Sequence, residues 1–208
     1  MKKTLLIIAI FTVCFFVSNA QFNTGQKFIA GGLSFNSYTM NYTDTSSYKT
    51  LNTGINFSMG KFISPLHSIG WGVFYNYSHV NLSSSIPTDK SNTNDFGANF
   101  FSNYYQPLFK NFYAMVSWNN SVSVSLSNNN ENGNGSGFSI GSSLNPGFVY
   151  QLNKRFLFNA TLTNLISLGY STMKYDKLYK SSNQFSFSSS LRSGNLSNVS
   201  LGFTYLLK

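Results

Sequence analysis

The stretch FYAMVSWNNSVSVSL, residues 112–126, decides the fold of this chain. Its side chains alternate almost without error, with Phe112, Val116 and Trp118 on the apolar parity and mainly Ser or Asn on the other from Ser117 onward. A period of two residues is typical of a β-strand that has one apolar face and one polar face. The stretch alone does not say which of the two faces meets water.

The same period recurs from residue 27 to the C-terminal end and predicts eight strands. Each is at least as long as the roughly 9–11 residues that a tilted strand needs to cross a bilayer. Short and long connectors alternate between them, as periplasmic turns and external loops do, and an even strand count places both termini on the periplasmic side. The predicted strands are residues 27–42, 49–62, 69–82, 94–106, 112–126, 138–152, 156–170 and 196–207.

Three places depart from this regular pattern. In the first strand the apolar side chains change parity at Tyr38 and Met40, which predicts a β-bulge near Asn36. Pro146 removes a ladder donor from the sixth strand, but the parity is unchanged across it, which favours a kinked strand over a turn. Residues 184–191 are interpreted as a hairpin in the last loop, with part of a long eighth strand as the alternative.

The N-terminus has the pattern of a cleaved secretion signal. Lys2 and Lys3 precede an apolar run over residues 4–17, and small residues lead to a cleavage site between Ala20 and Gln21. The run is shorter than the roughly 20 residues of a spanning helix, which disfavours an uncleaved anchor. We therefore predict a signal peptide over residues 1–20 and one barrel domain over residues 21–208.

Composition excludes several classes of function. Cys14 is the one cysteine and lies inside the signal, after Val13 rather than the small residue that lipid attachment needs, so the mature chain has no thiol chemistry. Of the 14 Lys and Arg residues two are in the signal, which leaves 12 basic against 5 acidic residues. The basic residues are scattered along the chain rather than clustered, so nucleic acid is not predicted as a partner.

The polar parity decides which face is outside. Soluble domains average about 25% charged residues, whereas this chain has 9% and carries Ser, Asn and Gly on that parity. The apolar parity holds most of the 21 Phe, 13 Tyr and 2 Trp residues, a surface that would aggregate in water. A closed barrel in lipid accommodates that surface and pairs every backbone group. We therefore predict an all-β fold, a transmembrane antiparallel up-and-down β-barrel, with a soluble β-sandwich or lipocalin-like barrel as the alternative.

Aromatic residues near both strand ends predict two girdles at the membrane interfaces. The competing explanation is that Phe and Tyr simply favour strands. The predicted girdle residues are Phe62, Trp71, Phe109, Phe112, Phe156 and Tyr205 near the short turns, and Tyr38, Tyr42, Tyr75, Tyr77, Phe96 and Tyr170 near the long loops.

The signal, the eight amphipathic strands and the stretch VSLGFTY over residues 199–205 resemble the small outer-membrane β-barrels of Gram-negative bacteria, the OmpA-like and OmpX-like barrels. The resemblance covers essentially the whole mature chain. It implies a location in the cell outer membrane and recognition of the last strand by the barrel assembly machinery. The chain departs from the family by ending on Leu207 and Lys208 rather than on an aromatic residue.

His79 is the weak candidate for a catalytic residue. Some small outer-membrane barrels are lipid A hydrolases or acyltransferases that use Ser and His, oriented by an acid. Ser83 shares the parity of His79, but Asp95 has inward parity and Asp89 lies in a loop, so no acid is in obvious reach of the imidazole. We expect an interfacial histidine, and keep a lipid A modifying enzyme centred on His79 as the alternative function.

Metal or cofactor binding is not predicted. His67 follows a short turn and is expected to be a solvated turn residue. The acidic residues lack the close spacing of an oxygen-ligand site. They are Asp44, Asp89, Asp95, Glu131 and Asp176.

The last external loop carries the one basic group, Lys174, Lys177, Lys180 and Arg192. At the outer leaflet these side chains would pair with lipopolysaccharide phosphates. The alternative is a solvated loop merely rich in Lys, because exposed ion pairs are weak.

Transport is the third candidate function. Eight strands enclose an interior only wide enough for side chains, and the shortage of inward charges argues against selectivity by charged rings. The sequence therefore predicts a structural or interaction role, as an envelope component or accessory subunit. Its predicted partners are outer-membrane lipid, lipopolysaccharide and another outer-membrane protein, with a narrow channel ranked after the enzyme.

Overall fold

The described residues, 22–43, 46–83, 89–130, 132–162, 164–177, 181–189 and 199–207 of a computed structural model, form one antiparallel sheet. The predicted all-β fold is confirmed. Within these ranges no helix has the length and apolar character needed to cross a membrane. The strands are β1 (Lys27–Thr43), β2 (Ser46–Ser64), β3 (His67–Ser83), β4 (Asp89–Phe109), β5 (Phe112–Asn129), β6 (Gly133–Gln151), β7 (Phe156–Leu162), β8 (Ile166–Tyr175), β9 (Ser182–Ser189) and β10 (Val199–Leu206).

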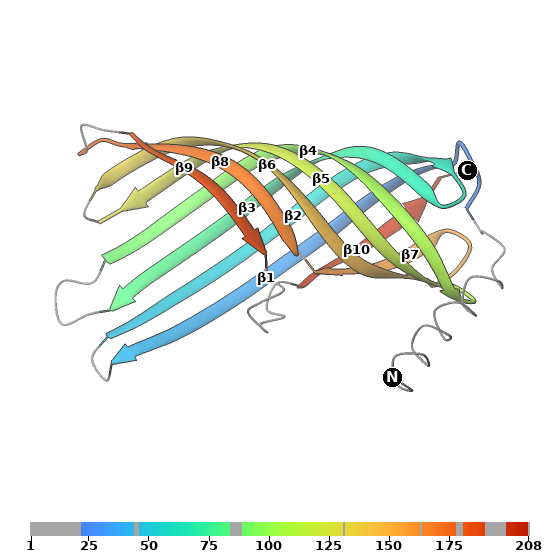
Figure 1. Cartoon of the computed structure of the whole chain (residues 1–208), viewed down its shortest axis with the longest axis horizontal. Helices are drawn as coiled ribbons and strands as arrows, with labels where there is room; N and C mark the ends of the chain where they lie inside the picture. The colour runs from blue at the N-terminus through green and yellow to red at the C-terminus, as the bar shows by residue number, and fades with distance from the viewer. Residues whose placement is uncertain are drawn as a thin grey trace, which may run out of the picture.

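These strands occupy eight positions around a barrel wall (Figure 1). Strands β1 to β6 pair in sequence order. Strand β6 then pairs with β7 near the short turns and with β8 near the long loops, so β7 and β8 together form the seventh position. Strand β10 pairs with both β7 and β1 and closes the ring. The predicted eight-stranded barrel is confirmed, with its last two positions each divided into two strands.

The eighth position is shared by β10 and β9. Strand β9 pairs with β8 from Ser182 to Ser189, so these residues belong to the wall and the interpretation of a separate loop hairpin is wrong. In the described chain β9 has no second neighbour, and β1 beyond Phe35 pairs with β2 alone. Among the described strands the ladder is therefore interrupted between β9 and the part of β1 beyond Phe35.

Pro146 lies within a continuous β6, which confirms the prediction that the strand runs through it. The pairing partner of β6 changes there, from β8 at Leu144 to β7 at Gly147. Pro146 itself has no partner in either of these two ladders, and a residue without an N–H is tolerated at such an interruption. The bend between β7 and β8 is held by Asn145, whose Oδ1 accepts a hydrogen bond of 2.7 Å from the backbone N–H of Asn164.

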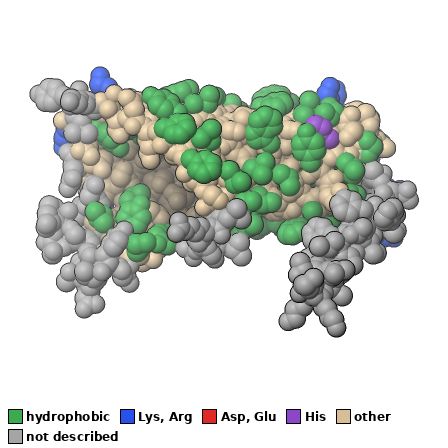
Figure 2. All heavy atoms as spheres, in the orientation of Figure 1, with side chains coloured by type: hydrophobic (Ala, Val, Ile, Leu, Met, Phe, Trp, Pro, Cys, Tyr) green, Lys and Arg blue, Asp and Glu red, His purple; other side chains and the backbone are tan. Residues whose placement is uncertain are grey.

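The exterior of the barrel is apolar, as the sequence predicts. Leu33, Trp71, Trp118 and Phe203 are all exposed on the outward parity of their strands, and Figure 2 shows apolar side chains across the visible outer surface. An apolar exterior around a barrel is the arrangement that a bilayer requires.

One prediction for β1 is wrong. Its register with β2 runs without a break from Lys27 to Asn41, so no bulge lies near Asn36, and the irregularity is between Asn41 and Thr43. The inward parity therefore continues through Tyr38 and Met40, and Tyr38 is not part of an outer girdle. The change of apolar parity instead falls on the part of β1 that pairs with β2 alone among the described strands.

A cluster of buried apolar side chains closes the barrel at the short-turn end. Phe62, predicted in the outer girdle, faces inward here and is 1% exposed, so that prediction is also wrong. Its ring stacks on Phe22 at 4.4 Å between centroids. We call this cluster the aromatic floor; its members are Phe22, Phe28, Phe62, Phe101, Tyr105, Tyr113, Met115, Val149, Leu157 and Leu206.

Candidate functional site

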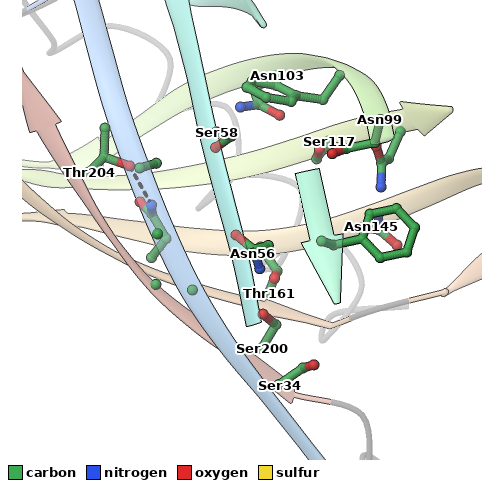
Figure 3. Close-up of a pocket in the computed structure, with 18 of the residues that line it drawn as sticks. Ser34, Asn56, Ser58, Asn99, Asn103, Ser117, Asn145, Thr161, Ser200 and Thr204 are labelled. Atoms are coloured by element: carbon green, nitrogen blue, oxygen red, sulfur yellow. Dashed lines mark hydrogen bonds between the residues drawn. The ribbon is translucent and has the colours of Figure 1, made fainter. Parts of the chain in front are cut away.

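A polar cavity of about 470 Å³ lies above the aromatic floor, inside the barrel. Its wall is made mainly of the small polar side chains of the inward parity, and none of its described lining residues is Lys, Arg, Asp or Glu. Figure 3 shows labelled Asn, Ser and Thr side chains that approach the cavity from several strands. They include Ser34, Asn56, Asn99, Ser117, Asn145 and Thr204.

Some of the cavity amides are held by neighbouring side chains. Asn99 donates to Asn119 Oδ1 at 2.8 Å, from β4 to β5. Asn159 donates to the hydroxyl of Thr204 at 2.8 Å, from β7 to β10. These bonds cross between adjacent strands, so they fix the orientation of four polar groups on the cavity wall.

Other cavity amides and hydroxyls keep free bonding capacity. In the described chain the side chains of Asn56 and Asn76, on the adjacent strands β2 and β3, make no hydrogen bond with another protein group. Both line the cavity, where water or a ligand reaches them. A polar group that faces a cavity without a protein partner retains the capacity to bind one.

The floor of the cavity is aromatic. Phe28 and Phe101 lie 6.2 Å apart, and Tyr105 contacts Phe62 at 5.6 Å between ring centroids. The Tyr105 hydroxyl is 3.1 Å from the hydroxyl of Ser68. Among the described residues, packed rings at these separations fill the lumen at the short-turn end.

The sequence does not predict this floor. The sequence nevertheless contains an indication of the floor. Each floor residue on a strand is an apolar side chain near the short-turn end, at a position where the other side chains on the same face of the strand are mostly small or polar. Phe28 on β1 and Phe62 on β2 illustrate it, since both share the parity of Gly and Asn neighbours.

His79 lies on the outward parity of β3, and its hydrogen-bond partner is an amide. Its Nδ1 is 2.7 Å from Asn92 Oδ1, an oxygen that also accepts a bond of 3.0 Å from the Tyr77 hydroxyl. Asp95 is on the opposite parity of β4, inside the barrel. Among the described side chains the imidazole therefore has no carboxylate contact of the kind that a Ser-His-acid arrangement would require.

His67 is more firmly held than a solvated turn residue. Its Nε2 is 2.7 Å from the Ser102 hydroxyl, and its ring stacks on Tyr104 at 4.1 Å. In the described part of the chain no three His, Cys, Asp or Glu side chains come together in a way that could hold a metal ion.

The predicted basic group is placed in part. Lys174 is exposed on the outward parity of β8, and Lys177 is exposed just beyond it. Two lysines from other strands, Lys49 of β2 and Lys90 of β4, are also exposed on the outward parity at the long-loop end. The sequence does not predict a role for Lys49 and Lys90, because each is far along the chain from the other lysines at this end. Lys180, Arg192 and the cleavage site at Ala20 and Gln21 lie outside the described residues.

No protein-family profile matches the sequence, and no curated protein sequence matches it. Solved structures do match the fold. The outer membrane protein OprG from Pseudomonas aeruginosa has 11% identity and a TM-score of 0.52, with 91% of this chain and 99% of that chain covered. Ail, the attachment invasion locus protein of Yersinia pestis, has 11% identity and a TM-score of 0.40, with 89% and 100% covered. The fold is that of the outer-membrane β-barrels.

Proposed function

We propose that this outer-membrane barrel has a structural and interaction role, in which it binds lipopolysaccharide phosphates through a rim of lysines. We call Lys49, Lys90, Lys174 and Lys177 the outer rim lysines. The observation that carries the proposal is that three of them, on three different strands, are exposed on the lipid-facing parity at the long-loop end. That end faces outward in barrels of this class.

The position of these ammonium groups suits phosphate contact. Each outward lysine continues the lipid-facing side of its strand, so its stem lies along the apolar exterior while its ammonium group extends toward the headgroups. Lys174, for example, follows Leu168 and Tyr170 on the same side of β8. Charge-assisted bonds to phosphate are stronger than neutral ones. Asp176, exposed next to Lys177, offsets part of the positive charge.

Catalysis and free diffusion receive less support than binding. His79 contacts the amide of Asn92 rather than a carboxylate, which argues against the lipid A enzyme. The aromatic floor fills the short-turn end, where Phe62 is 1% exposed, which argues against an open channel. Both features favour a barrel that functions by binding other molecules.

The test compares two charge-reversed rims of the same barrel. One variant carries Lys49→Glu, Lys90→Glu, Lys174→Glu and Lys177→Glu. The control carries Lys27→Glu, Lys61→Glu, Lys110→Glu and Lys154→Glu, four exposed lysines at the short-turn end. Binding of purified lipopolysaccharide to each folded barrel in detergent is measured by titration, with phosphatidylglycerol as the comparison lipid.

We expect the outer rim variant to bind lipopolysaccharide at least tenfold more weakly, because four exposed contacts of about 0.5 kcal/mol each are lost. The control should bind as the unmodified barrel does. Equal weakening by both variants would show a general attraction to anionic lipid, and no weakening by the outer rim variant would remove the proposal.

A further inference from the structure

The inward side chains of this barrel do not fill the lumen above the aromatic floor. The interior of an eight-stranded barrel is wide enough to be filled by side chains or to hold one small ligand. Here the inward positions above the floor are mostly Ser, Asn and Gly, and a cavity of about 470 Å³ remains. We propose that this cavity is a binding site for one small, uncharged, hydroxyl-rich molecule of the monosaccharide or disaccharide class.

The volume is suitable for such a ligand. Small-molecule sites in proteins measure about 300–1,000 Å³ and combine apolar surface with a few directed polar groups. This cavity falls in that range and contains both kinds of surface. The proposal concerns the lumen and does not depend on the outer rim lysines.

The described wall of the cavity carries no charged side chain, and this selects the ligand class. Its described polar lining residues are all Asn, Ser, Thr or Tyr. Asp95 faces the lumen beside Asn76 but does not line the cavity, so an ionised ligand would give up hydration on entry without a charged partner in the lining. Amide and hydroxyl groups, in contrast, act as both donors and acceptors and match the hydroxyl groups of an uncharged ligand.

The free bonding groups lie at the right place for such contacts. Asn56 and Asn76 line the cavity without a side-chain hydrogen bond in the described chain, on neighbouring strands. On the next two strands of the sheet, β4 and β5, Asn99 and Asn119 are oriented by their mutual bond of 2.8 Å. That bond leaves the Asn99 carbonyl and the Asn119 NH₂ group available, so four consecutive strands present amides to a ligand.

The aromatic floor supplies the apolar surface. Phe28, Phe101 and Tyr105 belong to the floor and also line the cavity. The carbon-bound face of a sugar ring can pack on such rings while its hydroxyl groups bond to the wall above. Because the floor closes the short-turn end, a molecule bound here has no exit on that side.

The floor leaves the long-loop side of the cavity as the route of entry. Among the described strands, β9 and the part of β1 beyond Phe35 are not paired with each other. Figure 2 shows the surface hollowed at the long-loop half of the molecule. We place the entry of a solute on this side, away from the floor.

The test uses the full barrel folded in detergent micelles and titrated with neutral sugars, namely glucose and maltose, and with charged analogues, namely gluconate and glucosamine. Binding is measured by isothermal titration calorimetry and by saturation-transfer NMR. Asn119→Leu removes one cavity amide, and Ser117→Phe fills part of the cavity. Asn120→Leu is the matched control, because Asn120 follows Asn119 on β5 and has the outward, lipid-facing parity.

We expect saturable binding of at least one neutral sugar, weakened tenfold or more by Asn119→Leu and abolished by Ser117→Phe, with no change for Asn120→Leu. Retention of the heat-modifiable mobility of the folded barrel on gels establishes that each variant is folded. If Ser117→Phe does not fold, Asn119→Leu against Asn120→Leu decides the question. Failure of both neutral sugars to bind, equal or tighter binding of a charged analogue, or equal effects of Asn119→Leu and Asn120→Leu would each overturn the proposal.

Discussion

The replacement Phe62→Ala tests whether the aromatic floor is a packed core. Phe62 is 1% exposed. Its ring centroid lies 4.4 Å from that of Phe22, 5.6 Å from that of Phe28 and 5.6 Å from that of Tyr105. Removal of the ring therefore affects groups from the N-terminal segment, β1, β2 and β4 at once.

The expected loss is about 3–5 kcal/mol of unfolding free energy, the range for Phe→Ala in a core. Part of it is the transfer of the ring out of an apolar site, about 1.5–3 kcal/mol. Aromatic pairs add about 0.5–1.5 kcal/mol each beyond area, and Phe62 makes three. The surrounding strands are fixed by their ladders and cannot collapse into the space, which places the loss in the upper half of the range.

The measurement is reversible unfolding in urea of the barrel in lipid vesicles, followed by tryptophan fluorescence. The control is Phe57→Ala on the same strand, where Phe57 is 47% exposed on the lipid-facing side. Lipid chains close around the smaller side chain there, so no cavity remains and the loss should be less than half as large. Equal losses for the two variants, or a loss below about 1 kcal/mol for Phe62→Ala, would refute a packed floor.

Two further predictions concern the functions that ranked lower. The unmodified barrel should show no conductance in planar bilayers, because the floor closes the short-turn end, whereas the double variant Phe62→Ala, Tyr105→Ala should conduct; steady current through the unmodified barrel would show that the floor opens. His79→Ala should leave the mass spectrum of cellular lipid A unchanged, because His79 contacts an amide, and a shifted lipid A mass would return the enzyme to consideration.

The parity of side chains was sufficient to predict most of the wall. The alternation around Trp118 correctly assigns the lipid-facing side of β5 and the serines of the lumen. Pro146 was correctly kept within β6 because the parity was unchanged across it. The alternation of side chains between two faces follows from the backbone geometry of a strand. It can therefore be recognised in the sequence wherever the two faces meet different solvents.

The predicted assignment of side chains to the two faces of the wall is wrong where apolar side chains face the inside of the barrel. Phe62 and Tyr38 have the inward parity. Both are predicted on the exterior because an apolar side chain is expected to face lipid. The division of the last two wall positions was missed for a different reason. It depends on which strand pairs with which, as when β6 changes partner at Pro146, and pairing is a property of the whole sheet rather than of one segment.

The candidate binding site was hidden for a related reason. Asn56 and Asn119 read as ordinary lumen residues in the sequence, because the same side chains can either fill a barrel or line a space within it. The difference depends on volume: the floor residues take up the short-turn end, the small residues above them do not reach across the lumen, and a cavity of about 470 Å³ remains. Ligand binding in this barrel therefore depends on where the large inward side chains of the floor end and the small inward side chains begin. Substitutions that move that boundary, such as Ser117→Phe from above or Phe62→Ala from below, should change ligand binding and closure independently.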